Sequence, residues 1–280
     1  IVSPLAKHLG TACNWKADYV INLASNSAVE RSMTDPTECW RNNCDIILNM
    51  LEFVRGGIGC EKFLQMSTDE VYGDYVGDGA GNVEWDTMLP SNPYAASKAA
   101  QEMLCQAYWR SFETPIVIVN TMNNIGERQD AEKFLPRIIE YVSTGKTLKV
   151  YTDPSGKPGS RVYLDAKNHA SAVEYILRHC IVHPYNRGYG DYDRPAKINV
   201  AGDNELDNFE FAKIVARLMG KELNASLVTS ESVRPGYDKR YLLDGKVMEN
   251  MGWKPPIAFE DTLARIIKHS QDKPWWIGAN

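Results

Sequence analysis

The sequence predicts an α/β protein in which a parallel β-sheet carries helices on both faces. In roughly the first 125 residues, short β-branched apolar runs alternate with longer segments whose apolar residues recur every three or four positions. Strands that alternate with helices in this way are joined by crossover connections, so they lie parallel in one sheet. The predicted strands are 17–24, 62–66 and 116–120, and the predicted helices are 36–55 and 93–112.

The boundaries of these elements follow from local signals. The first apolar run ends in small residues, as expected of a buried strand that stops at a ligand crevice. Gly56 and Gly57 end the first long helix, and Pro93 begins the second after a capping residue, Ser91 or Asn92. Beyond about residue 125 the alternation weakens, and we expect a strand at 197–200 and helices near 132–144, 167–179, 207–220 and 259–270.

The sequence divides into two predicted parts. We expect residues 1–125 to form a nucleotide-binding domain that carries the catalytic residues. Residues 126–280 should form mainly a smaller substrate-binding lobe. Segments at about 160–200 are candidates to add strands to the main sheet. A doubly wound nucleotide-binding sheet starts with a strand, a GxxGxxG turn and a helix, and nothing before Ala17 supplies them. The fold expected is a Rossmann-like doubly wound parallel sheet that lacks its first β-α-β unit, plus the C-terminal lobe.

Composition excludes several classes of protein. The net charge of -5 provides no general attraction to nucleic acid or to an anionic membrane. No apolar stretch approaches the roughly twenty residues of a membrane span. The six cysteines form no CxxC pair and no zinc-type spacing with histidine. We therefore expect a cytoplasmic protein with reduced thiols, without a metal site and without nucleic-acid or membrane partners.

The strongest local signal for chemistry is the segment YAASK at 94–98. Tyr94 and Lys98 are four residues apart on one helix face, so their head groups can converge on one site. A lysine ammonium near a phenol favours the phenolate and should lower the pKa of Tyr94 toward the range of a general base. The simple alternative is an amphipathic helix with a surface lysine, because a YxxxK pair alone often occurs by chance.

A second polar segment, STDEVYG at 67–73, follows the predicted strand 62–66. Thr68, Asp69 and Glu70 would lie at the carboxyl end of that strand, where ligands bind in open α/β sheets. In isolation the two acids fit a solvated turn. The ordered combination of strand, STDEVYG, NPYAASK and another strand favours one catalytic crevice shared with Tyr94.

At this point the chain resembles the extended short-chain dehydrogenase/reductases and, within them, the dTDP-glucose 4,6-dehydratases. The resemblance runs from about Ile1 to the C-terminus. Segments similar to family motifs are NLAS at 22–25 with VERS at 29–32, NNIG at 123–126 with EKFLP at 132–136, NVAGDNE at 199–205 and RPGYD at 234–238. Arg161 matches the arginine of the family's RDWLYVEDHA segment.

The resemblance implies NAD as cofactor and a nucleoside-diphosphate hexose as substrate. It implies that Tyr94, assisted by Thr68 and Lys98, deprotonates the sugar 4-hydroxyl while hydride leaves C4. Glu70 then removes the C5 proton, Asp69 protonates the departing 6-hydroxyl, and hydride returns to C6. The implied cofactor-binding residues are Leu23, Ala24, Ser25, Ser67, Tyr94 and Lys98, although the missing GxxGxxG segment predicts weak NAD binding by these residues alone. The implied substrate-binding residues are Asn124, Lys133, Arg161, Asn204, Arg234 and Tyr237.

The resemblance also implies a homodimer through helices 36–55 and 93–112, which carry more apolar residues than one side of a sheet should cover, including Trp40 and Met103. The chain departs from the family at Asn26, Ala28, Val162 and Tyr237, which leaves the sugar and the nucleotide base open. Two alternatives remain. One is a nucleotide-sugar 4-epimerase or UDP-glucuronate decarboxylase of the same fold, and the other is a non-catalytic protein that binds sugar nucleotides.

Overall fold

A computed structural model describes residues 16–56, 59–182, 193–229 and 239–277. The elements that build the main sheet and its covering helices are β1 (Tyr19–Asn22), α2 (Val29–Thr34), α3 (Pro36–Arg55), β2 (Lys62–Met66), the 3-10 turn η1 (Asp69–Tyr72), α4 (Pro93–Phe112), β3 (Ile116–Thr121), α6 (Ala166–His179), β7 (Ala196–Val200) and α8 (Lys246–Asn250). The other elements are β4 (Asn123–Ile125), α5 (Phe134–Thr144), β5 (Leu148–Thr152), β6 (Ser160–Asp165), β8 (Glu205–Asp207), α7 (Asn208–Leu218), β9 (Ala225–Thr229), α9 (Phe259–Asp272) and the 3-10 turn η2 (Pro274–Ile277).

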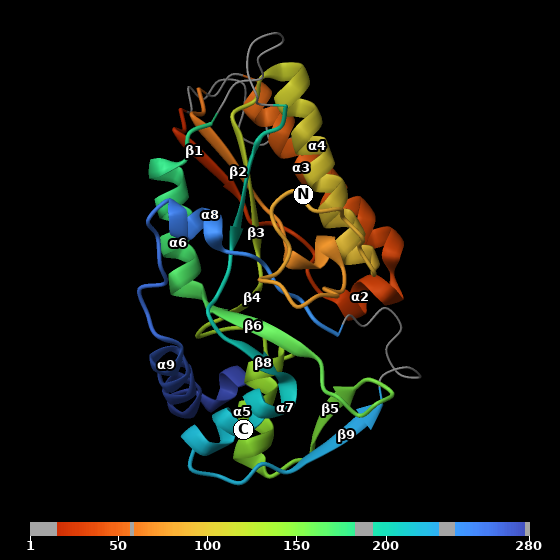
Figure 1. Cartoon of the computed structure of the whole chain (residues 1–280), viewed down its shortest axis with the longest axis vertical. Helices are drawn as coiled ribbons and strands as arrows, with labels where there is room; N and C mark the ends of the chain where they lie inside the picture. The colour runs from red at the N-terminus through yellow and green to blue at the C-terminus, as the bar shows by residue number, and fades with distance from the viewer. Residues whose placement is uncertain (1–15, 57–58, 183–192, 230–238, 278–280) are drawn as a thin grey trace.

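The main sheet is parallel, with strand order β1-β2-β3-β7. Helices α3 and α4 cover one face, and α6 and α8 lie on the opposite side (Figure 1). The doubly wound α/β fold predicted from the sequence is therefore confirmed. Strand β7 comes from the C-terminal half of the sequence and pairs with β3 inside this sheet.

The strands of this sheet are apolar on both faces because both faces are covered. Phe63 and Ile116 pack with α3 and α4, including the fully buried Trp109. Their neighbours Leu64 and Val117 point the other way and pack with α6 and α8. The observed bounds of α3, β2 and α4 are those predicted, because a proline after a capping residue starts each helix.

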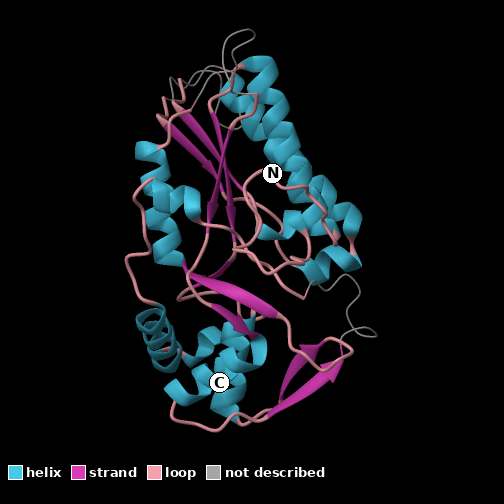
Figure 2. Ribbon diagram, viewed as in Figure 1, coloured by secondary structure: helices cyan, strands magenta, loops and turns pink. Residues whose placement is uncertain are grey.

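The second half of the molecule has its own core, with small sheets in place of one large sheet (Figure 2). Strand β6 pairs with β4 in parallel and with β8 in antiparallel, and β5 pairs with β9. Helices α5, α7 and α9 pack together around buried residues such as Phe211 and Leu263. These helices were predicted, whereas the five short strands were not, because three to six residues do not establish a periodicity.

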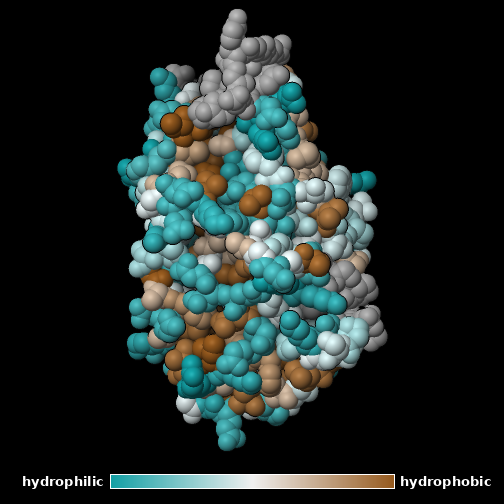
Figure 3. All heavy atoms as spheres, viewed as in Figure 1, coloured by the Kyte–Doolittle hydropathy of each residue, from teal (hydrophilic) through white to brown (hydrophobic). Residues whose placement is uncertain are grey.

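The surface shown in Figure 3 mixes hydrophilic and hydrophobic residues, and the brown areas are interrupted by teal side chains. Within the described ranges, no helix has the length and hydrophobicity required to cross a membrane. The same residues contain no group of three or more histidine, cysteine or acidic side chains placed to hold a metal ion. Five cysteines in these ranges are free thiols, namely Cys39, Cys44, Cys60, Cys105 and Cys180.

Candidate active site

The turn after β2 brings three predicted catalytic side chains together. Thr68 caps the 3-10 turn η1, because its hydroxyl accepts a hydrogen bond from the backbone N–H of Glu70 at 3.3 Å. The same hydroxyl donates to Oδ1 of Asp69 at 3.0 Å. Thr68 and Asp69 are buried and Glu70 is half-buried. The sequence S-T-D-E therefore folds into one compact polar corner at the carboxyl end of a central strand.

Tyr94 faces this corner from the first turn of α4. Asn92 is the capping residue, and its Oδ1 accepts from the backbone N–H of Ala95 at 2.9 Å. Pro93 follows as the first helical residue. The phenol of Tyr94 is buried and hydrogen-bonded to the side chain of Thr68. The prediction that YAASK and STDEVYG share one site agrees with this contact.

The predicted effect of Lys98 on Tyr94 is wrong in this structure. Burial raises the pKa of Tyr94 above its ordinary value, and the nearby carboxylates of Glu70 and Asp69 raise it further. The ammonium of Lys98 instead donates to the backbone carbonyl of Met66 at 2.6 Å and to Oε1 of Gln101 at 2.7 Å. Helical spacing placed both residues on one face correctly, but it could not show that buried acceptors at the end of β2 hold the lysine.

The pKa of Lys98 is also shifted by its surroundings. Burial lowers the pKa of its ammonium to about 8, and the carboxylate of Glu102 opposes this shift. Gln101 also accepts a hydrogen bond from Gln65, whose Oε1 accepts from the amide of Asn22. A chain of buried amides thus fixes Lys98 relative to β1 and β2.

The environment of Asp69 favours the protonated carboxylic acid over the carboxylate. Burial, followed by the negative charge of Glu70, raises the pKa of Asp69 to about 7. Its Oδ2 has no hydrogen-bond partner within the described residues. A neighbouring pair of acids in different environments favours opposite protonation states, as a site for both proton donation and proton removal requires.

The raised pKa of Asp69 predicts a pH-dependent stability. The folded-state value lies above the ordinary value of 3.8, so ionisation opposes folding, and the free energy of unfolding should fall as pH rises from about 4 through about 7. The side chain of the Asp69→Asn variant cannot ionise, so this fall should be absent from the variant. The free energy of unfolding of the parent minus that of the variant should therefore be larger at low pH than at pH 8. Urea unfolding of both proteins at several pH values checks this, and a stability difference independent of pH would contradict it.

Glu70 is held by two side chains that the sequence analysis did not select. Its Oε2 accepts from the amide of Asn92 at 3.1 Å and from the hydroxyl of Tyr241 at 3.4 Å. Asn92 stood out in the sequence only as a helix cap. Tyr241 follows the RPGYD segment, but no local pattern indicates that residue 241 reaches residue 70.

A buried charge network lies behind the site. Glu102 pairs with Lys197 of β7 at 2.7 Å, and both side chains are fully buried. Glu102 also accepts from Asn120 at 2.8 Å, and Asn120 donates to the carbonyl of Thr68 at 3.1 Å. The hydroxyl of Ser67, a predicted cofactor contact, donates to Glu102 and therefore faces this network rather than the crevice.

The other predicted cofactor residues lie at the carboxyl end of β1. Leu23 is 65% exposed there, and the N–H of Ala24 donates to the side chain of Asn22 at 3.2 Å. Ser25 follows in the same loop, where its hydroxyl donates to the carbonyl of Asn26. Because β1 and β2 are paired, this end of β1 adjoins the end of β2 where Lys98 is held. An exposed apolar side chain and a buried ammonium that can donate to hydroxyls fit the nicotinamide riboside half of NAD.

The predicted substrate-binding residues occupy the second half of the molecule. Arg161 on β6 lies 4.4 Å over the ring of Tyr241, and its positive charge acts on Asp69. The amide of Asn124 on β4 donates to Thr121 and to the carbonyl of Met122. Lys133, before α5, and Asn204, before β8, are exposed. Arg234 and Tyr237 lie outside the described residues.

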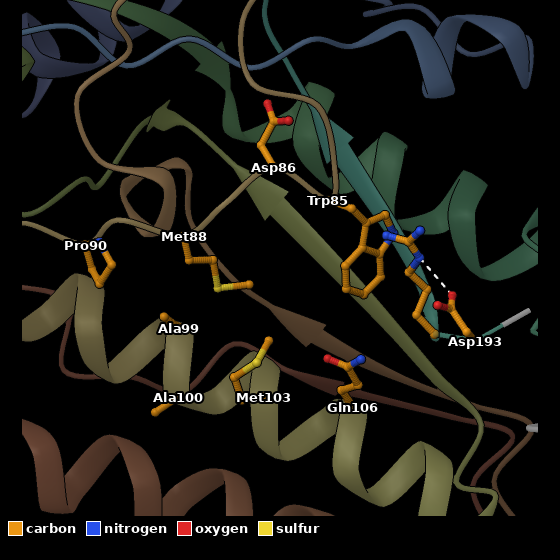
Figure 4. A pocket seen from close by; sticks show the side chains of 10 residues that line it. Trp85, Asp86, Met88, Pro90, Ala99, Ala100, Met103, Gln106 and Asp193 are labelled. Carbon is orange, nitrogen blue, oxygen red and sulfur yellow. Dashed lines mark hydrogen bonds and ion pairs between the residues drawn. The ribbon is translucent and has the colours of Figure 1, made fainter.

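A separate pocket of about 530 Å³ lies between α4 and the loop that precedes it. Figure 4 shows Met103 and Gln106 of α4 facing Trp85 and Met88 of the preceding loop. The guanidinium of Arg194 lies 5.0 Å from the centre of the Trp85 ring. None of the predicted site residues lines this pocket, so it is distinct from the corner formed by Thr68 and Tyr94.

The parallel sheet, with a tyrosine and a lysine on one helix at its carboxyl end, is the arrangement of the extended short-chain dehydrogenase/reductases. The profile of the GDP-mannose 4,6 dehydratase family matches residues 12–266. The chain therefore belongs to this family.

Relatives and solved structures agree with this assignment. A dTDP-glucose 4,6-dehydratase of Neisseria gonorrhoeae is 32% identical over 272 residues, which cover 91% of this chain and 74% of that protein. A trifunctional UDP-glucose 4,6-dehydratase of Arabidopsis thaliana is also 32% identical, and the match covers 92% of this chain but only 37% of the plant protein. A structure of the dTDP-glucose 4,6-dehydratase of Streptomyces venezuelae with NAD bound has a TM-score of 0.80 at 27% identity, covering 94% of this chain and 76% of that one.

Proposed function

We propose that the protein catalyses the NAD-dependent dehydration of a nucleoside-diphosphate hexose, of the dTDP- or UDP-glucose type, to the 4-keto-6-deoxy sugar. The observation that carries this proposal is the acid pair Asp69 and Glu70 beside Tyr94, in which burial favours the protonated form of Asp69. Oxidation at C4 needs one base for the hydroxyl proton besides the hydride acceptor. Elimination across C5 and C6 needs a second base and an acid, and this corner contains both.

Each side chain of the site has its own role in the proposed reaction. Tyr94, hydrogen-bonded to Thr68, would accept the proton of the sugar 4-hydroxyl as its phenolate, which the positive charges of a bound oxidised nicotinamide and of Lys98 would favour against the effect of burial. Leu23, Ala24 and Lys98 would hold NAD, which would supply the hydride acceptor for C4 and, once reduced, the hydride for C6. The 4-keto group acidifies the C5 proton, Glu70 removes that proton, and the protonated carboxyl of Asp69 donates to the departing 6-hydroxyl.

The nucleotide half of the substrate would bind to the second half of the protein. Arg161 and Lys133 supply positive charge for the diphosphate, and arginine can bind phosphate oxygens through two parallel hydrogen bonds. Asn124 and Asn204 supply amides for the sugar and the base. We also propose that Arg234 and Tyr237 bind the substrate, and this rests on the family motif alone.

A nucleotide-sugar 4-epimerase is the second candidate, because the structure of a Thermus thermophilus UDP-glucose 4-epimerase with NAD has a TM-score of 0.78 at 25% identity. An epimerase needs the base at Tyr94 but not the two acids. Product analysis with dTDP-glucose and UDP-glucose separates the two activities. A 4-keto-6-deoxy sugar supports dehydration, whereas the 4-epimer as the only product overturns it.

We further propose a cytoplasmic homodimer built on α3 and α4. Trp40 of α3 and Met103 of α4 are each 47% exposed, and pairing these helices with those of a second copy would bury both side chains. The free thiols of the described cysteines suit a reducing compartment.

The dimer proposal predicts the effect of a charge on these helices. Trp40→Glu should convert the dimer to a monomer at micromolar concentration, because a carboxylate cannot be buried there without a partner. Light scattering measures the mass. Leu227→Glu on β9, a position also exposed but remote from α3 and α4, is the matched control and should stay dimeric. A monomeric parent would contradict the proposal.

A further inference from the structure

The base proposed for the elimination is held from two directions. Asn92 belongs to the start of α4 and Tyr241 to a segment far away in the sequence, and both donate to the same oxygen, Oε2 of Glu70, at 3.1 Å and 3.4 Å. Both donors are buried, at 6% and 7% exposure, while Glu70 is half-buried. Two fixed donors on one oxygen restrict the rotation of a carboxylate.

Each donor is itself fixed by a further contact. The amide of Asn92 cannot turn over, because its Oδ1 caps α4 through the N–H of Ala95 and its nitrogen must then face Glu70. This single residue ties the carboxylate to the helix turn that carries Tyr94. Asn92 therefore couples the position of the Glu70 carboxylate to the position of Tyr94.

Tyr241 is braced by Arg161. The guanidinium lies 4.4 Å over the tyrosine ring, and its Nη1 donates to the carbonyls of Ser160 at 2.6 Å and Lys239 at 3.0 Å. A cation over an aromatic face stabilises the ring in place. Since Ser160 begins β6 and Lys239 precedes Tyr241, the arginine joins the substrate-binding half to the segment that reaches Glu70.

We propose that Tyr241 and Asn92 are positioning residues that orient the Glu70 carboxylate for removal of the C5 proton, with Arg161 bracing Tyr241. This inference rests on the proposed dehydratase function and deepens it. It concerns the second half of the reaction, because the side chains of Asn92 and Tyr241 both donate to Glu70, the proposed base for the C5 proton. Their loss should slow elimination and leave oxidation nearly unchanged.

The decisive variant is Tyr241→Phe, which keeps the ring under Arg161 and removes only the hydroxyl. In the full-length protein with NAD and the nucleotide-hexose that the parent converts, NADH absorbance should rise at the parental rate and persist. Formation of 4-keto-6-deoxy product and exchange of solvent deuterium into C5 should slow about tenfold, the usual scale for one hydrogen bond to a charged group. KM should change less than twofold.

The matched control is Tyr108→Phe. Tyr108 lies on α4, and its hydroxyl donates to the carboxylate of Glu52 at 2.6 Å, the same chemistry away from the crevice. This variant should show parental rates in both steps. Asn92→Ser, which preserves a hydroxyl acceptor for the helix cap and adds no charge but is too short to donate to Glu70, should reproduce the selective loss of elimination.

A measurement independent of activity tests the contact itself. In a double-mutant cycle of Tyr241→Phe with Glu70→Gln, urea unfolding should show non-additive changes, whereas Tyr108→Phe with Glu70→Gln should be additive. Additivity in the first cycle overturns the proposal, as does equal slowing of NADH formation and elimination by Tyr241→Phe. A parent that makes no 4-keto-6-deoxy product overturns the proposed function, whereas a productive parent with unimpaired Tyr241→Phe overturns only the positioning role.

Discussion

Glu70→Gln should abolish dehydration while the first hydride transfer continues. The amide has nearly the shape of the acid but cannot accept the C5 proton, so we expect the rate of product formation to fall about a thousandfold, within the range for loss of a general base. Tyr94 and Thr68 are unchanged, and oxidation at C4 should proceed. Mixing the variant with NAD and substrate should therefore accumulate NADH absorbance without 4-keto-6-deoxy product or deuterium at C5.

Glu61→Gln is the matched control for this variant. Glu61 is exposed before the amino end of β2, opposite to the end where Glu70 lies, so its loss should leave both steps unchanged. A Glu70→Gln protein that forms product near the parental rate would show that another group removes the C5 proton. The acid pair would then no longer distinguish a dehydratase from an epimerase.

Tyr94→Phe should suppress the earlier step. Without the phenol, the proposed base for the 4-hydroxyl is lost, and we expect the rate of NADH formation to fall about a thousandfold. Substrate binding should be largely retained, because the proposed diphosphate contacts lie on other elements. Rapid mixing at 340 nm, roughly the reduced-nicotinamide band, measures the step, and calorimetry measures binding.

Tyr108→Phe serves as control here as well, because Tyr108 lies on the same helix with its hydroxyl directed to Glu52. Since Tyr94 is buried, a change in folding must be excluded, and the urea midpoint of each variant provides that check. Formation of NADH by Tyr94→Phe at the parental rate would remove Tyr94 from the mechanism. A loss of NADH formation by Tyr108→Phe would instead indicate a general effect on α4.

Local signals in the sequence were sufficient to predict the strand and helices next to the proposed catalytic residues. Capping residues and prolines set the starts of α3 and α4, and an apolar run bounded by polar residues set β2, so these three were predicted with their observed bounds. The spacing of Tyr94 and Lys98 and the order of Thr68, Asp69 and Glu70 then identified the proposed catalytic groups. Their roles stay predictions, but their positions follow from strand and helix geometry.

The tertiary structure decided everything that depends on contacts between distant residues. It turned Lys98 toward Met66 and Gln101, turned Ser67 toward Glu102, and brought Tyr241 to Glu70. It also raised the pKa values of Tyr94 and Asp69 through burial, which no sequence spacing reveals. The physical reason is that periodicity specifies which face a side chain occupies, whereas its hydrogen-bond partner and its exposure to water depend on what packs against that face.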